Sequence, residues 1–369
     1  SQIDEAFKHE EGYNGALMRF GSAEKAYKEA KQLLIDNTKL VNEDLFFDYS
    51  VLVSGANSKH EVHFDFIKND NLPYRINVII GKNGTGKTQF LGSMVNSISG
   101  VKYQNSFSPY NPLFRKVIAI SYSLFDDFPK PEETTVFSYK YIGIRSKDEE
   151  IVSDEKLGEK LRKALMIILK EDRSNLWFDW VSKIIQLENL GLNNYMDLTE
   201  TWIENLSYKN AKRLSSGQSI TLFILTELIA NILDESLILF DEPETHLHPS
   251  AIGQLIIVFH QILSYFNSYA IISTHSPIII QDIPSKYISI FDRTGDSPII
   301  RKLPLESFGE NISTLTSKVF DTLEVKELYK IFLEKLSYQS IEDIESLFEN
   351  ELSINAQLYL AALQKNRNE

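Results

Sequence analysis

The sequence contains no cysteine, and this absence excludes several classes of protein. Without thiols the chain cannot be a small secreted scaffold held by disulfides, and it has neither a thiolate nucleophile nor a thiolate zinc site. A metal ion bound to this chain must therefore be a hard cation held by oxygen atoms, or be bound by one of the seven histidines.

Long apolar runs and an excess of basic charge are also missing. No apolar stretch approaches the roughly 20 residues needed to cross a bilayer, and residues 1–10 lack the basic-then-apolar order of a secretory signal. We therefore expect a cytoplasmic protein without a membrane partner. Lys and Arg number 38 against 51 Asp and Glu, and the net charge of -13 has the wrong sign for a protein that coats nucleic acid. Binding to nucleic acid would require a local basic face or a partner.

The sequence does contain a strand-like apolar run that ends in two carboxylates. Residues 237–240 (LILF) show no polar alternation, which is typical of a central strand in a parallel sheet. Asp241 and Glu242 follow directly, at the end of the strand where ligands bind in open α/β sheets. A solvated strand end is the alternative interpretation. With 43% hydrophobic residues among 369, the chain can form one large α/β domain or two modest ones.

A glycine-rich segment supplies a second and more specific pattern. Residues 81–88 fit G-x-x-x-x-G-K-[ST] in full, after the strand-like run 76–80 and before a segment with apolar residues at helical spacing. Glycines let backbone N–H groups curl around an anion, and the positive end of the following helix adds to the attraction. A glycine-rich turn without a ligand is the alternative. We predict phosphate binding by Gly81, Lys82, Asn83, Gly84, Thr85, Gly86, Lys87, Thr88 and Gln89.

The two patterns together predict an ATP site with a magnesium ion. Lys87 is expected to reach the β- and γ-phosphates, and the Thr88 hydroxyl is expected to bind Mg²⁺. Asp241 then corresponds to the Walker B carboxylate, which helps to hold the metal ion. Glu242 is placed to polarise the water that attacks the γ-phosphate.

Two further motifs narrow the class of P-loop protein. Residues 213–219 (RLSSGQS) resemble the L-S-G-G-Q signature of ABC ATPases, with Ser216 in place of the first glycine, and they precede Asp241 by about one helix and a turn. His275 follows another apolar strand and resembles the switch histidine of that family. Each motif has an ordinary alternative, a helix N-cap for the serines and a buried core position for the histidine.

The resemblance to ABC ATPases carries a mechanical implication. In that family the signature of one subunit completes the nucleotide site of the other, so that two ATP molecules are held in a head-to-tail pair. The resemblance therefore implies a homodimer or a higher oligomer, with Lys87, Glu242 and His275 as the catalytic residues of each site. The residues that would contact the nucleotide of the second chain are Ser215, Ser216, Gly217 and Gln218.

One motif of the family is missing. ABC ATPases carry a glutamine after a strand between the P-loop and the helical region, and Gln89 and Gln104 come too early for it. The corresponding strand is expected within 117–128, whose polar residues are Ser121, Ser123, Asp126 and Asp127. The metal-sensing loop is therefore unassigned.

The sequence after Glu242 separates transporter subunits from other ABC-type ATPases. Transporters read D-E-P-T-S-A-L-D where this chain has DEPETHLHP, a version that resembles soluble RecF-like, SMC-like and overcoming-lysogenization-defect ATPases. His246 and His248 are not expected to bind zinc, because no second ligand cluster is present and Pro249 suits a helix start. No sustained heptad pattern is present, so a long SMC-type arm is excluded.

The whole pattern resembles the ATPase subunit of Septu and Septu-like retron anti-phage systems, which work with a separate HNH endonuclease. The chain itself has no D-x-D cluster of a TOPRIM nuclease and no HNH arrangement. The resemblance implies a nucleotide-controlled regulatory subunit with a nuclease partner, and contact with nucleic acid through the complex. A RecF-like DNA-repair clamp and a regulatory ATPase without a nucleic-acid role are the alternatives.

We therefore expect an α/β fold, an ABC-type P-loop ATPase head with a mixed or parallel sheet core, a helical signature subdomain and a short C-terminal helical region. Five segments are expected along the chain. They are an accessory helical segment (1–44), an N-lobe with the P-loop (45–135), a helical insert (136–213), a C-lobe with signature, Walker B and switch histidine (214–305), and a helical tail (306–369).

Overall fold

The computed structural model describes residues 45–98, 106–109, 111–123, 128–129, 138–145, 154–206, 214–245, 247–320 and 328–368. The chain divides into two compact units, Ser1–Leu315 and Thr316–Glu369, which are described separately. The accessory segment expected over 1–44 lies outside the described residues.

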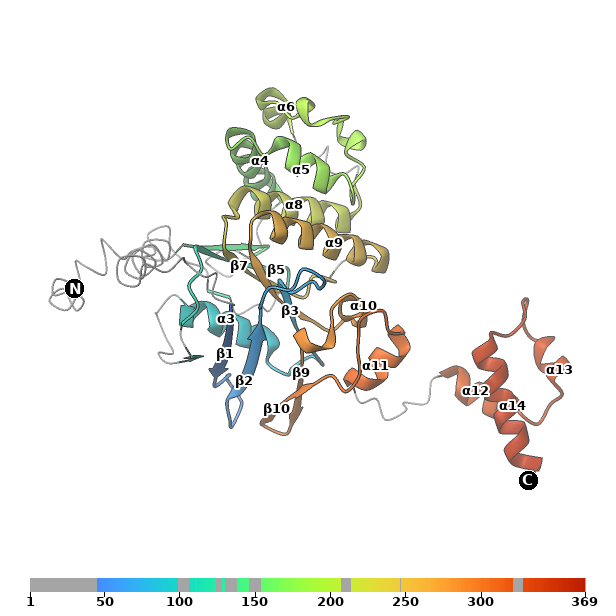
Figure 1. Ribbon diagram of the computed structural model, residues 1–369. Coiled ribbons are helices and arrows are strands. Elements are labelled where there is room, and N and C mark those ends of the chain that lie inside the picture. Colours follow the sequence, from blue (N-terminus) through green and yellow to red (C-terminus); the bar gives the residue numbers. More distant parts are fainter. Residues whose placement is uncertain are drawn as a thin grey trace. The chain divides into compact units, whose positions relative to one another are not determined.

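Unit 1 is built on a seven-stranded sheet in the order β10-β9-β3-β8-β7-β5-β6 (Figure 1). Neighbouring strands from β9 to β6 are parallel, and only β10 runs antiparallel to its neighbour. The apolar run predicted as a central strand is β7, every residue of which is buried. The α/β fold with a mixed, mostly parallel sheet is thus confirmed. The strands are β3 Ile76–Gly81, β5 Lys116–Ser121, β6 Tyr139–Gly143, β7 Ser236–Asp241, β8 Tyr269–Thr274, β9 Ile288–Thr294 and β10 Ser297–Lys302.

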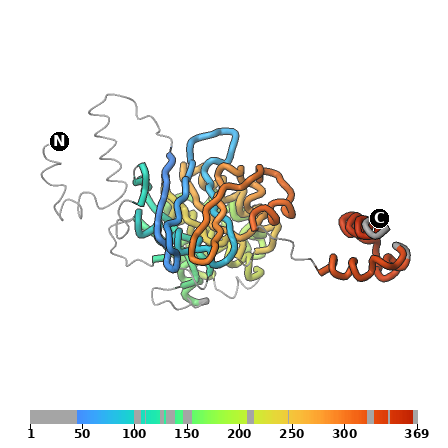
Figure 2. Tube along the Cα trace, turned by 90° about the horizontal axis from the view of Figure 1, so that it is seen from below, coloured from blue at the N-terminus to red at the C-terminus, as the bar shows by residue number. Residues whose placement is uncertain are grey.

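A small antiparallel sheet covers one face, with helix α3 (Lys87–Ile98) packed in the same core. Its strands are β1 Phe46–Val51, β2 His60–Asp65 and β4 Phe107–Ser108. The ring of Phe90 on α3 meets Tyr49 of β1 at 5.0 Å and Phe291 of β9 at 5.2 Å between centroids. This sheet was not predicted from the sequence, although β2 alternates buried and exposed residues as a half-buried strand should. Figures 1 and 2 show β2 beside β10, where Asn57 also donates to Ser297 (2.9 Å).

Helices cover the opposite face of the large sheet. Helix α9 (Pro249–Tyr265) places Phe259 against Phe240 of β7, with ring centroids 5.7 Å apart. Pro249 opens this helix as predicted, and the His248 side chain caps it by accepting from the backbone N–H of Ser250. His246 lies outside the described residues. The short helix α10 (Pro277–Gln281) follows β8, and the 3₁₀ turn η4 (Ser285–Tyr287) precedes β9.

The helical subdomain of unit 1 is joined to the sheet through α8. Trp177 donates its indole N–H to Thr226 (2.9 Å), which attaches α5 to α8. The Arg173 guanidinium donates to the Ile229 and Ile232 carbonyls at 2.7 and 3.1 Å and lies 5.1 Å from the Phe266 ring centroid. The elements are α4 Asp154–Lys170, α5 Ser174–Val181, η2 Leu187–Leu190, η3 Tyr195–Asp197, α6 Glu200–Asn205 and α8 Ser216–Asn231.

Two segment boundaries differ from the expected ones. The segment 136–213, expected to be a helical insert, begins with β6 of the large sheet, so its helices start only at Asp154. The C-terminal unit starts at Thr316 rather than at residue 306. The reason is that 306–315 is attached to unit 1, since Gln281 donates to the Glu310 carbonyl (2.7 Å) and Leu315 is fully buried.

The C-terminal unit is helical, as predicted for the tail. Tyr359 of α14 donates its hydroxyl to Glu334 of α12 at 2.8 Å, which links these two helices. The helices are α11 Ile312–Phe320, which crosses the unit boundary, α12 Leu328–Leu336, α13 Ile341–Glu345 and α14 Ile354–Asn368. Across the described residues, none of the helices combines the length and apolar character needed to cross a membrane.

Candidate functional site at the carboxyl edge of the sheet

A glycine loop connects β3 to α3 at the carboxyl edge of the large sheet. Gly84 and Gly86 have φ angles of 81° and 90°, a backbone region that side chains disfavour. At Gly81 a Cβ would lie 2.1 Å from the Phe291 carbonyl oxygen, so β3 and β9 can approach only because this residue is glycine. The local structure therefore accounts for the three glycines of the loop, Gly81, Gly84 and Gly86.

Lys87 lies inside this loop. Its Nζ donates to the carbonyl oxygens of Gly81 (2.8 Å) and Lys82 (3.0 Å), and the residue is only 4% exposed. Burial lowers the pKa of Lys87, while Glu242 and Asp241 raise it. Of the other predicted loop residues, Lys82, Asn83 and Gly84 are exposed, Thr85 is buried with its hydroxyl donating to the Lys82 carbonyl, and Gln89 is half-buried on the first turn of α3.

The structure brings the loop together with Asp241, the last residue of β7. Thr88 donates its hydroxyl to Asp241 Oδ2 at 2.8 Å, and Ser273 at the end of β8 donates to Oδ1. Burial raises the pKa of Asp241 to about 6, against the effect of these two hydrogen bonds. Thr88 and Asp241 are 153 positions apart in the sequence, so the fold places the two predicted metal ligands in direct contact.

The donor set fits the predicted ligands. No group of three or more His, Asp and Glu side chains able to hold a metal ion occurs in the part of the chain that the structure describes. Mg²⁺ does not require such a cage, because it is commonly held by one or two protein oxygens together with substrate phosphates and water. Thr88 and Asp241 offer those oxygens, and the loop with the start of α3 offers N–H groups to an anion.

Glu242 stands at a strained position beside this pair. Its φ of 48° lies in the left-handed region, which costs a residue with a side chain about 1 kcal/mol. Its N–H donates to the Ser273 carbonyl at 2.9 Å, and its side chain is 24% exposed. The neighbouring His275 ring lowers the pKa of Glu242, against the effect of burial, and this favours the ionised carboxylate. Strain of this kind is concentrated at functional sites.

His275 directly follows β8 and faces two carboxylates. Its Nδ1 lies 3.7 Å from Glu242 Oε1 and 3.1 Å from Glu244 Oε1. The carboxylate of Glu242 and, to a smaller extent, that of Glu244 raise the pKa of His275, whereas burial and Lys87 lower it. The structure thus brings together the three residues predicted to be catalytic, Lys87, Glu242 and His275, at one edge of the sheet.

Three polar residues of this edge were not predicted from the sequence. Glu244 and Ser273 lie within two residues of motif positions, but the periodicity of their segments gives no indication of their contacts. His60 begins β2, and its Nε2 donates to the Thr85 carbonyl at 3.3 Å, which ties the glycine loop to the small sheet. No signal in the sequence connects β2 with the loop, because the contact depends on the packing of the small sheet.

The signature segment lies at the start of α8. Ser215 is the N-cap, and its Oγ accepts from the Gln218 N–H (3.2 Å) while Gln218 Oε1 accepts from the Ser215 N–H (2.9 Å). The alternative interpretation as an N-cap therefore holds in the structure, and it leaves Ser215 and Ser216 exposed, with Gly217 and Gln218 half-buried. Figure 1 shows α8 beside α4 and α9, whereas α3 lies with the small sheet.

The position expected for the missing glutamine can be located in part. Ser121 ends β5 fully buried, with its Cα opposite that of Asp241, and its Oγ accepts from the Ser123 N–H (3.3 Å). Residues 124–127, including Asp126 and Asp127, lie outside the described residues. Ser121 thus lies beside the last residue of β7, without a glutamine at this point.

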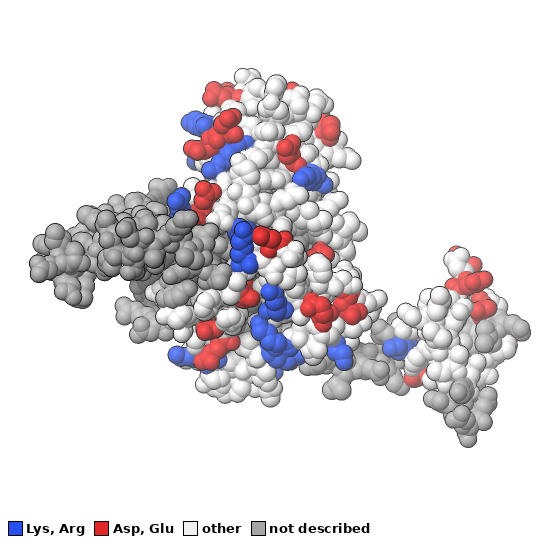
Figure 3. Space-filling view, viewed as in Figure 1, with Lys and Arg blue, Asp and Glu red and all other residues white. Residues whose placement is uncertain are grey.

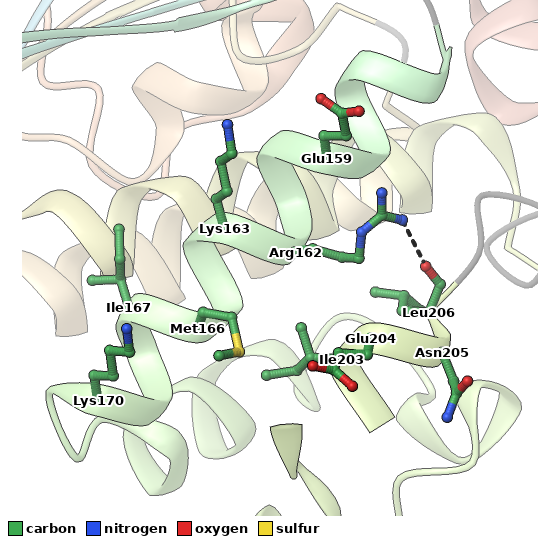
Figure 4. Close-up of a pocket in the computed structure, with 10 residues that line it drawn as sticks. All are labelled: Glu159, Arg162, Lys163, Met166, Ile167, Lys170, Ile203, Glu204, Asn205 and Leu206. Atoms are coloured by element: carbon green, nitrogen blue, oxygen red, sulfur yellow. Dashed lines mark hydrogen bonds between the residues drawn. The ribbon is translucent and has the colours of Figure 1, made fainter. Parts of the chain in front are cut away.

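A groove also lies between α4 and α6 (Figure 4). It has a volume of about 880 Å³ and contains none of the predicted site residues. Met166 and Ile203 face it, and Arg162 donates across it to the Leu206 carbonyl at 3.0 Å. The groove therefore belongs to the helical subdomain and not to the carboxyl edge of the sheet.

Several solved structures are similar to this chain. A nucleotide-free ATP-binding cassette from an ABC transporter is 15% identical, with a TM-score of 0.37, and the match covers 78% of this chain and 98% of that chain. UvrA2 from Deinococcus radiodurans is 12% identical, with a TM-score of 0.39, and the match covers 74% of this chain and 39% of that chain.

Sequence comparisons give two further findings. A family model described as "AAA domain, putative AbiEii toxin, Type IV TA system" matches residues 103–281, which include the carboxylates and His275 but not the glycine loop. Protein ea59 of Escherichia phage lambda is 28% identical over 368 residues, covering 88% of this chain and 69% of its own length. Over residues 103–281 the chain is therefore similar to this AAA family, and the glycine loop that precedes the matched region contacts Asp241 within it.

Proposed function

We propose that the chain is an ABC-type ATPase that binds and hydrolyses ATP at a head-to-tail dimer interface. The observation that carries this proposal is the contact of Thr88 with Asp241, which joins the glycine loop to the two carboxylates at the end of β7. In this proposal the lobes 45–135 and 214–305 form the nucleotide site, and the helices of 136–213 carry the signature subdomain.

The residues of the glycine loop and of the end of β7 have separate roles in this proposal. Loop N–H groups and the Lys87 ammonium bind the β- and γ-phosphates, while Thr88 and Asp241 hold Mg²⁺. When bound, the metal ion neutralises charge on the phosphate oxygens. Because the Thr88 hydroxyl and the Asp241 carboxylate are already in contact, their oxygens need little rearrangement to act together.

Glu242 is the proposed general base. It is ionised, because the neighbouring His275 ring lowers its pKa, and part of its side chain is exposed to solvent. An ionised, accessible carboxylate can accept a proton from the attacking water, which typically contributes ~10²- to 10⁴-fold in rate. His275, beside it, is proposed to contact the γ-phosphate.

The exposed signature turn supports a composite site. Ser215 and Ser216 stand exposed at the amino end of α8, where the helix dipole favours an anion. We propose that Ser215, Ser216, Gly217 and Gln218 contact the nucleotide bound to a second copy. ABC ATPase domains commonly dimerise, and one chain with a single copy of each motif requires a partner to complete the site.

The proposed biological role is regulation of an anti-phage complex with a separate HNH-type nuclease. The description of the matching family, which names a toxin of a type IV TA system, supports a defence role, and the nuclease partner rests on the resemblance of the sequence to Septu-like systems. On the face in Figure 3, described basic and acidic side chains of unit 1 are interspersed, which favours contact with nucleic acid through a complex over a clamp that coats DNA.

The test is a pair of measurements on the purified full chain. We expect Mg²⁺-dependent ATP hydrolysis by the wild type, and an ATP-dependent shift from monomer to dimer in Glu242→Gln, measured by light scattering after size exclusion. A monomer that hydrolyses ATP at full rate would contradict the composite site. ATP-dependent binding of duplex DNA at low salt would favour the clamp, and purification from the native host without a nuclease would contradict the defence role.

A further inference from the structure

Glu244 is a buried carboxylate without an assigned role. It lies three residues after Asp241 and is 8% exposed. The backbone carbonyl of Glu244 accepts a hydrogen bond from the Leu247 N–H (3.0 Å), which closes a turn. An ionised carboxylate removed from water is costly unless it is paired and hydrogen-bonded. The partners of Glu244 therefore indicate its purpose.

Its hydrogen bonds connect the turn after β7 to the end of β8. Oε1 accepts from the Thr274 hydroxyl (2.6 Å) and from the His275 N–H (2.7 Å), and it lies 3.1 Å from His275 Nδ1. Oε2 is buried and has no hydrogen-bond partner among the described residues. One oxygen atom thus contacts both the backbone and the ring of His275.

Glu242 and Glu244 differ in what they can reach. The Glu242 side chain is 24% exposed and lies 3.7 Å from Nδ1, whereas the Glu244 side chain is 6% exposed and lies 3.1 Å away. A carboxylate closed off from solvent cannot activate water, but it can hold a ring nitrogen. A carboxylate that accepts from one nitrogen of a histidine also determines which nitrogen remains for other contacts.

We propose that Glu244 is the positioning residue that holds the proton of His275 on Nδ1, so that Nε2 is the nitrogen presented to the nucleotide. The contact of Nε2 with the nucleotide rests on the proposed function. The position of the proton on Nδ1 rests on the contacts of Glu244 alone. The charged groups that face the ring are Glu242, Glu244 and Lys87. The raised pKa of His275 agrees with carboxylates on the Nδ1 side.

The first experiment measures the tautomer of His275 by NMR in the full chain with ¹⁵N-labelled histidine and no nucleotide. Its signal among those of seven histidines is identified by its loss in His275→Asn. We expect the Nδ1–H form in the wild type and in the matched control Glu242→Gln, and a shift toward the Nε2–H form in Glu244→Gln. An unchanged tautomer in folded Glu244→Gln would overturn the proposal.

A second variant covers the case in which Glu244→Gln does not fold. Thr274→Val keeps the carboxylate and removes the hydroxyl that fixes Oε1, so we expect a partial shift of the tautomer in the same direction. Thermal denaturation checks the fold of each variant. If Glu244→Gln does not fold and Thr274→Val keeps the wild-type tautomer, the proposal is wrong.

Kinetics then separate this proposal from the proposed function. In Glu244→Gln we expect kcat for ATP to fall about tenfold, as for other residues that orient a functional histidine, with KM changed less than about twofold. A wild type with the Nδ1–H tautomer but no hydrolysis would contradict the ATPase proposal and leave the positioning role of Glu244 standing. An unchanged kcat would overturn its role toward the nucleotide.

Discussion

The carboxyl edge of the sheet and the signature turn are both candidate parts of one nucleotide site, yet they are built differently. At the edge, side chains from distant segments bind each other, as Thr88 binds Asp241 and Glu244 binds Thr274. At the turn, Ser215 and Gln218 bind each other within one helix start, and the serines are exposed. The contacts of the edge thus form within one chain, whereas the exposed polar groups of the turn are available to a ligand or a second copy of the chain.

The largest effect is expected from Glu242→Gln, which tests the chemistry of the edge. Loss of the carboxylate removes the proposed base while keeping the side chain's shape, so ATP hydrolysis should fall at least ~100-fold with ATP still bound. Single-turnover experiments measure the rate of hydrolysis, and a nucleotide-retention assay measures the bound ATP. Glu235→Gln is the matched control, because Glu235 also has a positive φ (59°) but precedes β7 at its other end. Equal turnover in both variants would mean that Glu242 is not the base.

Lys87→Ala should weaken ATP binding by about 100-fold or more, because it removes a buried cation from the glycine loop. Isothermal titration with ATP and Mg²⁺ measures the affinity. Lys82→Ala changes an exposed lysine of the same loop and should alter affinity only slightly. If the two variants bind ATP equally well, the edge is not a phosphate site.

Ser215→Arg tests the signature turn. A long cation at an exposed cap should block closure between two copies and lower turnover about tenfold or more, whereas ATP binding to the edge of each chain should persist. Ser182→Arg, at an exposed position of the same helical subdomain, should leave turnover unchanged. Mixing Ser215→Arg with Lys87→Ala should restore at most one composite site per mixed pair. Full activity of Ser215→Arg alone would contradict a role of the signature turn in the nucleotide site.

A smaller effect is expected from pH. Asp241 has a pKa raised to about 6 by burial, so below that pH it is protonated and neutral, and it is then a poor ligand for Mg²⁺. Binding of Mg²⁺-ATP should weaken by about tenfold for each pH unit below 6. Titrations between pH 5 and pH 8 check this, with Asp241→Asn expected to bind weakly throughout. A flat profile would exclude Asp241 as the titrating metal ligand.

The sequence predicted those parts of the site that are contiguous in the chain. The glycine loop follows from a strand, a motif and a helix in order, and the carboxylates follow from an apolar run that must be buried. Glu244 and His60 were missed because their partners, His275 and Thr85, lie 31 and 25 positions away. The start of the C-terminal unit was placed too early, because helical spacing does not show which residues contact the sheet.

The anchoring of α8 gives its serine turn a mechanical connection to the far side of unit 1. The helix has 16 residues, or a length of about 24 Å, and Arg173 binds the carbonyls at its other end while lying over Phe266, just before β8. Since a packed helix moves as a rigid body, we expect a displacement of Ser215 to disturb the hydrogen bonds of Arg173 at the other end of α8. This disturbance can be measured as a change in the hydrogen exchange of the Ile232 N–H with and without ATP. Unchanged exchange would show that α8 does not transmit movement from Ser215 to Arg173.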